Sequence, residues 1–440
     1  MRGRGTAGLA FAFLWGCLGT LLTPDPCWSD SGEAGTADAQ KTETGGEAPT
    51  PSAAFWRRWL DPETAPFIPV PEIATNPNGG TTIGVLPVWV RTDENHVIRR
   101  IIAPDFFRNP NFGLGFHARL YSYPSEDEQW SLLAGAKQRV EREFDAEYVS
   151  GRSRSNRWSF AGSLLYDKDG TPRFYGIGND SPQGAETNFT EEQSLAQAQI
   201  GWNFDRAWQL LYTGRLRTVD VLPGTLSGIS SIEARFGTQR LGTRHEVLNR
   251  LSIVMDTRDE VTVPRRGMKS VAYVGTSSGG GLLNDSLFSE AGIDGRAFVP
   301  VARKTVVAAH LALRYLPTAN DLPVWALSSL GGSRSEIGGD QPLRGYGAGR
   351  FSDRNSFSSS VEVRQKVWKF DAITTPVELE VAPFVDVGRV FPMGTSPLEQ
   401  LHKVGGVAFR MIAVPFVVGY VDVGVGSEGP AVFSGIYYPF

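Results

Sequence analysis

Apolar and polar residues alternate with period two along most of this chain. In residues 111–121, NFGLGFHARLY, every second residue is apolar, and the residues between them are polar or small. The same alternation recurs in residues 129–141, 206–220 and 286–300. Successive side chains of a β-strand point to opposite faces, so each stretch predicts a strand with one apolar and one polar face. A soluble sandwich and a transmembrane barrel both fit this pattern.

The number of strands and the lengths of their connections separate these two folds. Connections after odd-numbered strands include long ones, at 91–110, 169–189, 221–245 and 317–354, whereas those after even-numbered strands are mostly short. Long extracellular loops and short periplasmic turns are typical of an outer-membrane barrel whose two ends both lie in the periplasm. The sequence therefore predicts an all-β fold, a 16-stranded antiparallel transmembrane β-barrel. The expected strands span residues 80–90, 111–123, 129–141, 142–150, 156–168, 190–205, 206–220, 246–258, 267–277, 286–300, 303–316, 355–369, 376–391, 402–413, 416–426 and 431–440.

The N-terminus predicts export. Two arginines precede an apolar run at residues 7–22, and CWS places small residues around a cleavage position before Asp30, as in a secretory signal peptide. Cleavage before Cys17, as in a lipoprotein, is the alternative. Both cysteines would leave with the signal peptide, so we expect no disulfide framework in the mature chain. The expected parts are a signal peptide at 1–29, a low-complexity periplasmic tether with a possible short helix at 30–79, and the barrel at 80–440.

The last residues, VFSGIYYPF, resemble the terminal β-signal of outer-membrane proteins. Phe440 ends the chain, with Tyr438 and Gly435 before it, although Phe433 stands where that signal usually has a polar residue. Pro439 lacks the backbone N–H of a ladder hydrogen bond and would weaken the closing edge of a barrel. We therefore expect an exported protein of the bacterial cell outer membrane.

A glycine-rich loop, GGDQPLRGYGAGRFSDRN at 338–355, joins expected strands eleven and twelve. On the strands that follow, the alternation places Glu362 on the lumenal face of one and Phe384 and Asp386 on the lumenal face of the next. A loop folded into the lumen would bring Arg344 to both carboxylates, where a charge-assisted contact is stronger than on a surface. The alternative is an exposed loop tip with an ordinary glycine-rich turn.

These stretches together resemble the BamA/TamA superfamily of outer-membrane barrels, also known as the bacterial surface antigen family, over about residues 80–440. The resemblance implies that Arg344, with Gly345 and Tyr346, locks to acidic residues of the next strands, which match Glu362 and Asp386. The matching stretches are RFYGIGNDS at 173–181, MDTRD at 255–259, LRGY at 343–346, SSVEVR at 359–364 and APFVDVGRVF at 382–391.

The resemblance also implies a function. Members of that superfamily assemble β-barrels into the outer membrane or export partner proteins, and some have no known client. Insertases of the family carry periplasmic POTRA repeats before the barrel, whereas the stretch from Asp30 to Gly80 is mostly tether. We therefore expect a POTRA-less member.

No catalytic, cofactor or metal site follows from the sequence, so we do not expect an enzyme. The five histidines fall on separate expected strands and loops without metal-ligand spacing. The DTRD group at 256–259 fits a solvated charge cluster or a cap of a turn, with a specific functional role as the alternative. A net charge of −4 argues against nucleic-acid binding.

Two functions from different classes remain open. The first is insertion or translocation of proteins through a seam between the first and last strands, to which the residues from Gly435 to Phe440 would contribute. The second is a structural or pore-forming surface barrel without assembly activity. The expected partners are outer-membrane lipids and, for the first function, unfolded outer-membrane protein clients of a monomeric barrel.

Overall fold

The fold is taken from a computed structural model. The predicted signal peptide, most of the predicted tether and the last four residues, among them Tyr438, Pro439 and Phe440, lie outside the described residues. The structure describes residues 68–93, 98–125, 127–151, 153–279, 286–319, 321–372, 375–413 and 417–436.

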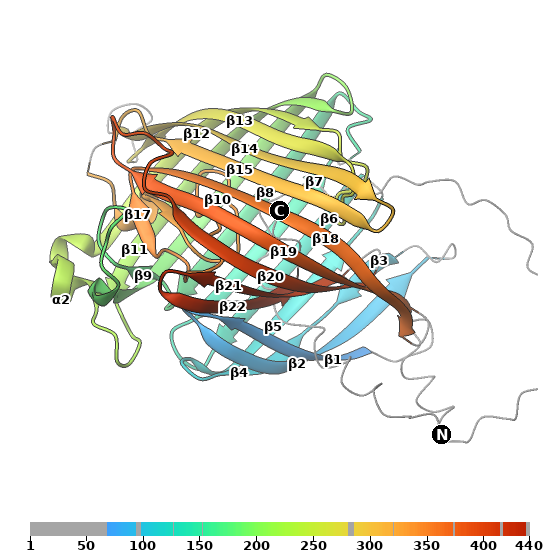
Figure 1. Cartoon of the computed structure of the whole chain (residues 1–440), viewed down its shortest axis with the longest axis horizontal. Coiled ribbons are helices and arrows are strands. Elements are labelled where there is room, and N and C mark those ends of the chain that lie inside the picture. The colour runs from blue at the N-terminus through green and yellow to red at the C-terminus, as the bar shows by residue number, and fades with distance from the viewer. Residues whose placement is uncertain are drawn as a thin grey trace, which may run out of the picture.

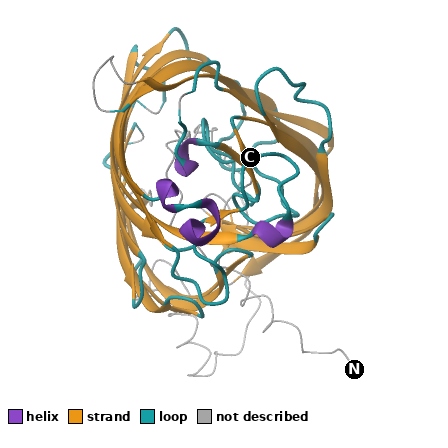
Figure 2. Cartoon of the chain, turned by 90° about the vertical axis from the view of Figure 1, so that its left-hand side faces the viewer, coloured by secondary structure: helices purple, strands orange, loops and turns teal. Residues whose placement is uncertain are grey.

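One antiparallel sheet curves round and closes on itself, because its first strand pairs with both the second and the last (Figures 1 and 2). The wall strands are β1 (Ile68–Asn76), β2 (Gly80–Thr92), β3 (Ile98–Ile102), β4 (Asp105–Asn109), β5 (Gly113–Ser122), β6 (Glu128–Lys137), β7 (Arg142–Ser150), β8 (Trp158–Asp169), β10 (Thr187–Asn203), β11 (Trp208–Pro223), β12 (Gly242–Asp256), β13 (Gly267–Ser278), β14 (Ser286–Ala302), β15 (Thr305–Tyr315), β18 (Asn355–Ala372), β19 (Thr375–Phe391), β20 (His402–Ala413), β21 (Val417–Gly426) and β22 (Gly429–Ile436).

Short elements lie in the connections. None of the helices in the described part of the chain is long and apolar enough to cross a membrane. These elements are β9 (Arg173–Phe174), η2 (Gln183–Ala185), α2 (Ile232–Phe236), η3 (Thr238–Arg240), η4 (Val324–Ala326), β16 (Ser328–Leu330) and β17 (Phe351–Asp353).

The wall has eighteen strands within the described residues, so the predicted number of sixteen was wrong. β3 and β4 count as one, because both lie between β2 and β5 and are interrupted only at Ala103 and Pro104. This strand falls in the predicted loop at 91–110. The interruption has a physical reason, since proline has no N–H to donate to a ladder.

The second missing strand is β1, which lies inside the predicted tether at 30–79. The prolines of residues 62–77 led us to expect an extended tether there, yet β1 pairs with β2 along its whole length. The barrel therefore begins at Ile68 and not at Gly80. Because two strands are added, their number stays even, and both ends of the wall remain on one side.

The alternating polar and apolar residues of each strand face the lumen and the outer surface of the barrel, respectively. On β18, Ser360 and Glu362 are buried toward the lumen, whereas the side chains of Val361, Val363 and Val367 are 45%, 40% and 52% exposed on the outer surface. Polar side chains inside and apolar side chains outside are the reverse of a soluble barrel.

The two ends of the barrel differ. The long connections, with α2 and β17, gather at the end on the left of Figure 1, and the hairpin turns of β14–β15 and β18–β19 lie at the opposite end. Viewed from the first end, loops and short helices lie within the opening (Figure 2). By the topology rule applied above, the first end is extracellular and the second periplasmic.

Candidate functional site

The connection between β15 and β18 enters the lumen and packs against one side of the wall. Its strands β16 and β17 pair with each other from Ser328↔Asp353 to Leu330↔Phe351. The apolar side chains of this loop share a buried cluster with the lumenal side of β19 and β20. The cluster consists of Leu330, Leu343, Tyr346, Phe351, Ala382, Phe384, Val390, Val404 and Ala408.

Arg344 lies at the centre of this contact, and its side chain is 1% exposed. Its Nη2 and Nε donate to the two carboxylate oxygens of Asp386 at 2.7 and 2.9 Å, and its Nη1 contacts Glu362 at 2.5 Å. The guanidinium carbon lies 3.5 Å from the centre of the Phe384 ring. Burial alone would lower the pKa of Arg344, but the two carboxylates outweigh it and hold the pKa well above its ordinary value. The structure thus brings these four residues together.

Further charged residues complete the network around Glu362. Its second oxygen accepts from Arg364 at 2.9 Å, and Arg410 on β20 contacts its first oxygen at 2.7 Å. Asp422 on β21 lies 3.3 Å from Arg344. Sequence reasoning missed Arg410 and Asp422. For Asp422 the available signal was that it is the single charge in the otherwise apolar or small β21, whereas β20 also carries Lys403 and gave no such signal for Arg410.

The residues next to Arg344 fit closely against β21. A side chain at Gly345 would place its Cβ 2.7 Å from both Val404 and the backbone nitrogen of Gly426. Tyr346 is buried, and its hydroxyl lies 2.9 Å from Ser427 Oγ and accepts from the Ser427 backbone at 3.0 Å. The predicted trio from Arg344 to Tyr346 therefore contacts four different strands of the wall or their turns. We call Arg344, Glu362, Phe384, Asp386 and Asp422 the loop anchor.

The seam between β1 and β22 closes the barrel. Within the described residues the two strands share one register pair, Thr75↔Ser434, whereas β1 and β2 share nine pairs and β21 and β22 share eight. The Thr75 N–H donates to Ser434 Oγ at 2.9 Å, and that hydroxyl donates to the Ile73 carbonyl at 3.3 Å. Gly435 lies beside this contact, where an added Cβ would come within 2.8 Å of the Tyr420 ring.

Comparison with known proteins shows the family to which this chain belongs. The family model of the Omp85 superfamily domain matches residues 128–406, which is more than half of the chain. The chain belongs to the Omp85 superfamily. Its β-barrel fold and this membership indicate an outer-membrane protein. No curated protein matches the sequence.

Three solved structures are similar to this chain at low identity. The crystal structure of BamA from Haemophilus ducreyi lacking POTRA domains 1–3 has a TM-score of 0.49 and 11% identity, covering 80% of this chain and 75% of that one. CdiB from Escherichia coli has a TM-score of 0.44 and 11% identity, covering 83% and 62%. CdiB from Acinetobacter baumannii has a TM-score of 0.42 and 12% identity, covering 83% and 58%.

A second arginine of the same loop fastens this Omp85 barrel at its extracellular end. Arg350 is 4% exposed and contacts both oxygens of Glu428, in the β21–β22 turn, at 2.9 and 3.0 Å through its Nε. It also donates to the Ser181 carbonyl at 2.8 Å and lies 4.4 Å from the centre of the Tyr175 ring. Sequence reasoning quoted the stretch that contains Tyr175 and Ser181 without assigning it a partner.

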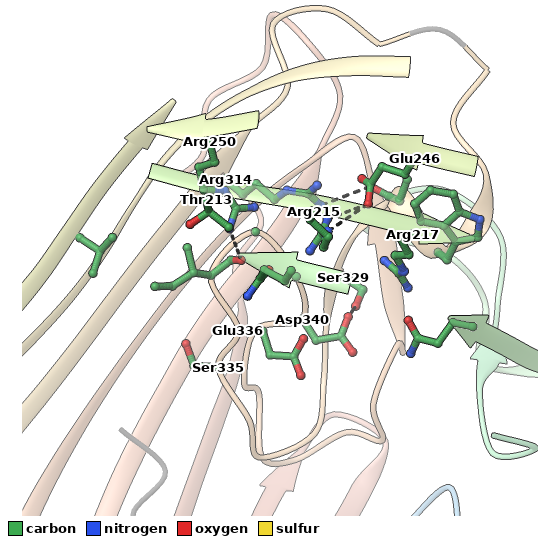
Figure 3. A pocket seen from close by; sticks show the side chains of 18 of the residues that line it. Thr213, Arg215, Arg217, Glu246, Arg250, Arg314, Ser329, Ser335, Glu336 and Asp340 are labelled. Carbon is green, nitrogen blue, oxygen red and sulfur yellow. Dashed lines mark hydrogen bonds and ion pairs between the residues drawn. The ribbon is translucent and has the colours of Figure 1, made fainter. Parts of the chain in front are cut away.

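Water-accessible space remains beside the loop. A cavity of about 500 Å³ separates the wall residues Arg215, Arg217 and Arg250 from the loop residues Glu336 and Asp340 (Figure 3). Each of these arginines pairs with a glutamate of the wall at 2.7 to 3.0 Å. A second cavity of about 400 Å³ is also lined by Glu336 and Asp340, so the loop borders two chambers that both contain charged side chains.

Ser335, His310 and Asp294 meet in the lumen, which no sequence pattern suggested. Ser335 Oγ lies 3.2 Å from His310 Nε2, and Asp294 Oδ2 lies 3.0 Å from the same nitrogen. A nucleophilic triad requires the hydroxyl and the carboxylate on opposite nitrogens of the ring. This contact therefore ties the loop to β14 and β15 and does not form a relay. Among the described residues, no group of three or more His, Cys, Asp or Glu is placed to hold a metal ion.

The DTRD group lies at a periplasmic turn and contacts itself and the turn backbone. Arg258 and Asp256 form an ion pair at 2.7 Å. One oxygen of Asp259 accepts from the backbone N–H groups of Glu260, Arg265 and Arg266 at 2.9 to 3.0 Å. Of the alternatives open from sequence, these contacts fit a cap of the turn.

Proposed function

We propose that this Omp85 barrel assists the insertion or translocation of protein clients at the outer membrane by opening its seam between β1 and β22. The observation that carries the proposal is the single register pair between these strands in the described part of the chain. Within the described residues, this seam has fewer register pairs than β1–β2 or β21–β22, so it should open at lower cost than those two pairs. An opened β1 would present unpaired C=O groups and the N–H groups of Ile73 and Thr75, to which an incoming strand can add.

The prolines of β1 support this proposal. The Thr75 N–H points to β22, since it donates to Ser434. Backbone N–H groups of residues two apart in a strand point the same way, so positions 69, 71 and 73 share this direction. Pro69 and Pro71 therefore remove two donors on the β22 side and leave the pairing with β2 intact.

The contacts of the loop anchor indicate which side of the seam is held in place when it opens. Through Arg344 it binds β18 and β19, and through Asp422 it reaches β21, the partner of β22. Arg350 binds the turn between β21 and β22. The C-terminal side of the seam is thus held to the loop by ionic contacts, whereas the β1–β2 turn contacts the loop through a hydrogen bond from Asn78 Nδ2 to the Ala348 carbonyl at 2.9 Å. We therefore expect β1 to be the side that moves more readily.

A disulfide across the seam tests the proposal. Thr75→Cys with Ser434→Cys places two cysteines at directly paired positions, which fits disulfide geometry. The matched control is Val423→Cys with Val432→Cys, a paired position within the C-terminal hairpin. In proteoliposomes, the wild type should accelerate folding of an unfolded outer-membrane protein. The oxidised seam variant should lose this acceleration and regain it with reductant, while the oxidised control keeps it.

A locked seam that leaves the acceleration unchanged would refute the mechanism. A wild type that accelerates nothing would favour the second candidate, a pore-forming surface barrel. The two chambers beside the loop, both lined in part by charged side chains, are the observation that favours this candidate. It predicts conductance of the same sample in planar bilayers that the seam disulfide does not change.

We further propose that the barrel works as a monomer without catalytic chemistry of its own. The lumenal Ser335, His310 and Asp294 contact lacks the geometry of a relay, as described above. Hydrolysis of ester or peptide probes by the wild type, lost in Ser335→Ala, would contradict this.

A further inference from the structure

The periplasmic rim of the barrel has two chemically different sectors. At the ends of β6, β8 and β11, outward Trp130, Trp158 and Trp208 are 54%, 50% and 43% exposed. Aromatic side chains of this kind mark the membrane interface in outer-membrane barrels. The rim from β12 to β18 carries a larger group of cations, and we call Arg265, Arg266, Arg303, Lys304 and Lys369 the basic sector.

The turns of the basic sector are joined to one another. Arg265 of the β12–β13 turn donates to the carbonyl of Arg303 in the β14–β15 turn at 2.6 Å. The backbone N–H of Lys366 on β18 donates to the carbonyl of Lys304 at 3.0 Å. The side chains of Arg266, Arg303, Lys304 and Lys369 are exposed. The cations therefore form a continuous patch across three neighbouring hairpins, whose tips lie opposite α2 in Figure 1.

Two of the nearby acidic groups are engaged with other partners. Asp259 caps the backbone of its own turn, and Glu378 binds Lys366, which is not counted in the basic sector. Glu260 is half-buried, and this burial, together with Asp259, raises the pKa of its carboxyl. The basic sector thus keeps an excess of positive charge toward its surroundings.

The basic sector stands at the edge of an apolar wall. Directly beside it, the outward side chains of Val299, Val301 and Trp368 are 55%, 60% and 64% exposed. A tryptophan at this height marks the level of the lipid headgroups. A ligand that meets both surfaces must carry a negative charge at the rim and an apolar body along the wall.

We propose that the basic sector is a binding site for anionic phospholipids of the periplasmic leaflet. The phosphate would contact the guanidinium and ammonium groups, which bind phosphate oxygens strongly, and the acyl chains would lie along Val299 and Val301. The aromatic sector, with fewer cations, would take up neutral headgroups. The barrel would thus order one class of lipid on one side of its circumference.

Lipid titration of the purified full chain in detergent, read by native mass spectrometry, tests the site. The test variant is Arg266→Gln, Arg303→Gln, Lys304→Gln, in which the carbonyls that join the turns remain. The control variant is Arg139→Gln, Arg206→Gln, Lys403→Gln, which removes three exposed cations elsewhere. Binding of phosphatidylglycerol should weaken at least about tenfold in the test variant, since each cation near an anionic surface contributes appreciably. The control should bind as the wild type does, and phosphatidylcholine should bind all three proteins equally.

Several results would overturn the proposal. Equal loss in the control would mean that net charge alone attracts the lipid, and undiminished binding in the test variant would place any site elsewhere. Full competition by inorganic phosphate would indicate an anion site without lipid selectivity. Folding of each variant is checked by its faster gel migration before heating. Lys304→Gln alone serves if the triple variant does not fold, and it should show a smaller loss in the same direction.

Discussion

Replacing Arg344 with alanine should affect its two carboxylate partners unequally. In the described part of the chain, Arg344 is the one ion-pair partner of Asp386, whereas Glu362 also pairs with Arg364 and Arg410 at 2.9 and 2.7 Å. Both carboxylates are fully buried. The substitution therefore leaves an uncompensated charge at Asp386 but not at Glu362. We expect a loss of about 3 to 5 kcal/mol in the free energy of unfolding, as for other broken buried pairs.

A second substitution locates the origin of that loss. Neutralising Asp386 in Arg344→Ala,Asp386→Asn removes the stranded charge, so the double variant should be more stable than the sum of its parts by about 2 kcal/mol. Arg344→Ala,Glu362→Gln should show a smaller coupling, because the second change also weakens the contacts of Arg364 and Arg410. Unfolding by urea in lipid vesicles, followed by tryptophan fluorescence, measures both cycles. Equal couplings for the two pairs, or none for Asp386, would refute the assignment.

Three further predictions concern the same loop. Gly424→Ala should release the loop at a cost of about 1 to 3 kcal/mol in the free energy of unfolding, because the new Cβ would lie 2.2 Å from the Arg344 carbonyl oxygen. Gly405→Ala has open space and should be silent, so external protease should cleave the loop only in Gly424→Ala. Arg350→Ala should expose the extracellular end of the loop to protease while the urea midpoint falls by less than in Arg344→Ala, since Glu428 is partly exposed. Because the pKa of Arg344 is raised, the stability that this residue contributes is complete below the ordinary arginine pKa and is lost only at higher pH. Protection of the loop from protease should therefore be equal at about pH 7 and pH 10. A decline in protection over that range would contradict the raised pKa.

Much of the barrel could be predicted because period two in the sequence is set by strand geometry itself. Each wall strand needs an apolar outer face regardless of its neighbours, so Val361 and Val363 reveal their strand without knowledge of the fold. β1 escaped prediction because the prolines around it are a local signal of extended, unpaired chain, and the strand formed by β3 and β4 escaped because residues 91–110 were assigned to a long loop. Whether a missing N–H matters depends on which neighbour it would have faced, and only the closed sheet defines that.

The contacts of the loop anchor were also predictable only in part from the sequence. The sequence alone placed Arg344 in a loop and Glu362 and Asp386 on lumenal faces, since side-chain direction follows from parity within each strand. Asp422 and Arg350 could not be assigned partners, because their contacts join segments whose proximity depends on how the barrel closes and how deeply the loop enters it. Strand faces are a local property of the chain, whereas contacts across a lumen arise only when the last strands return beside the first.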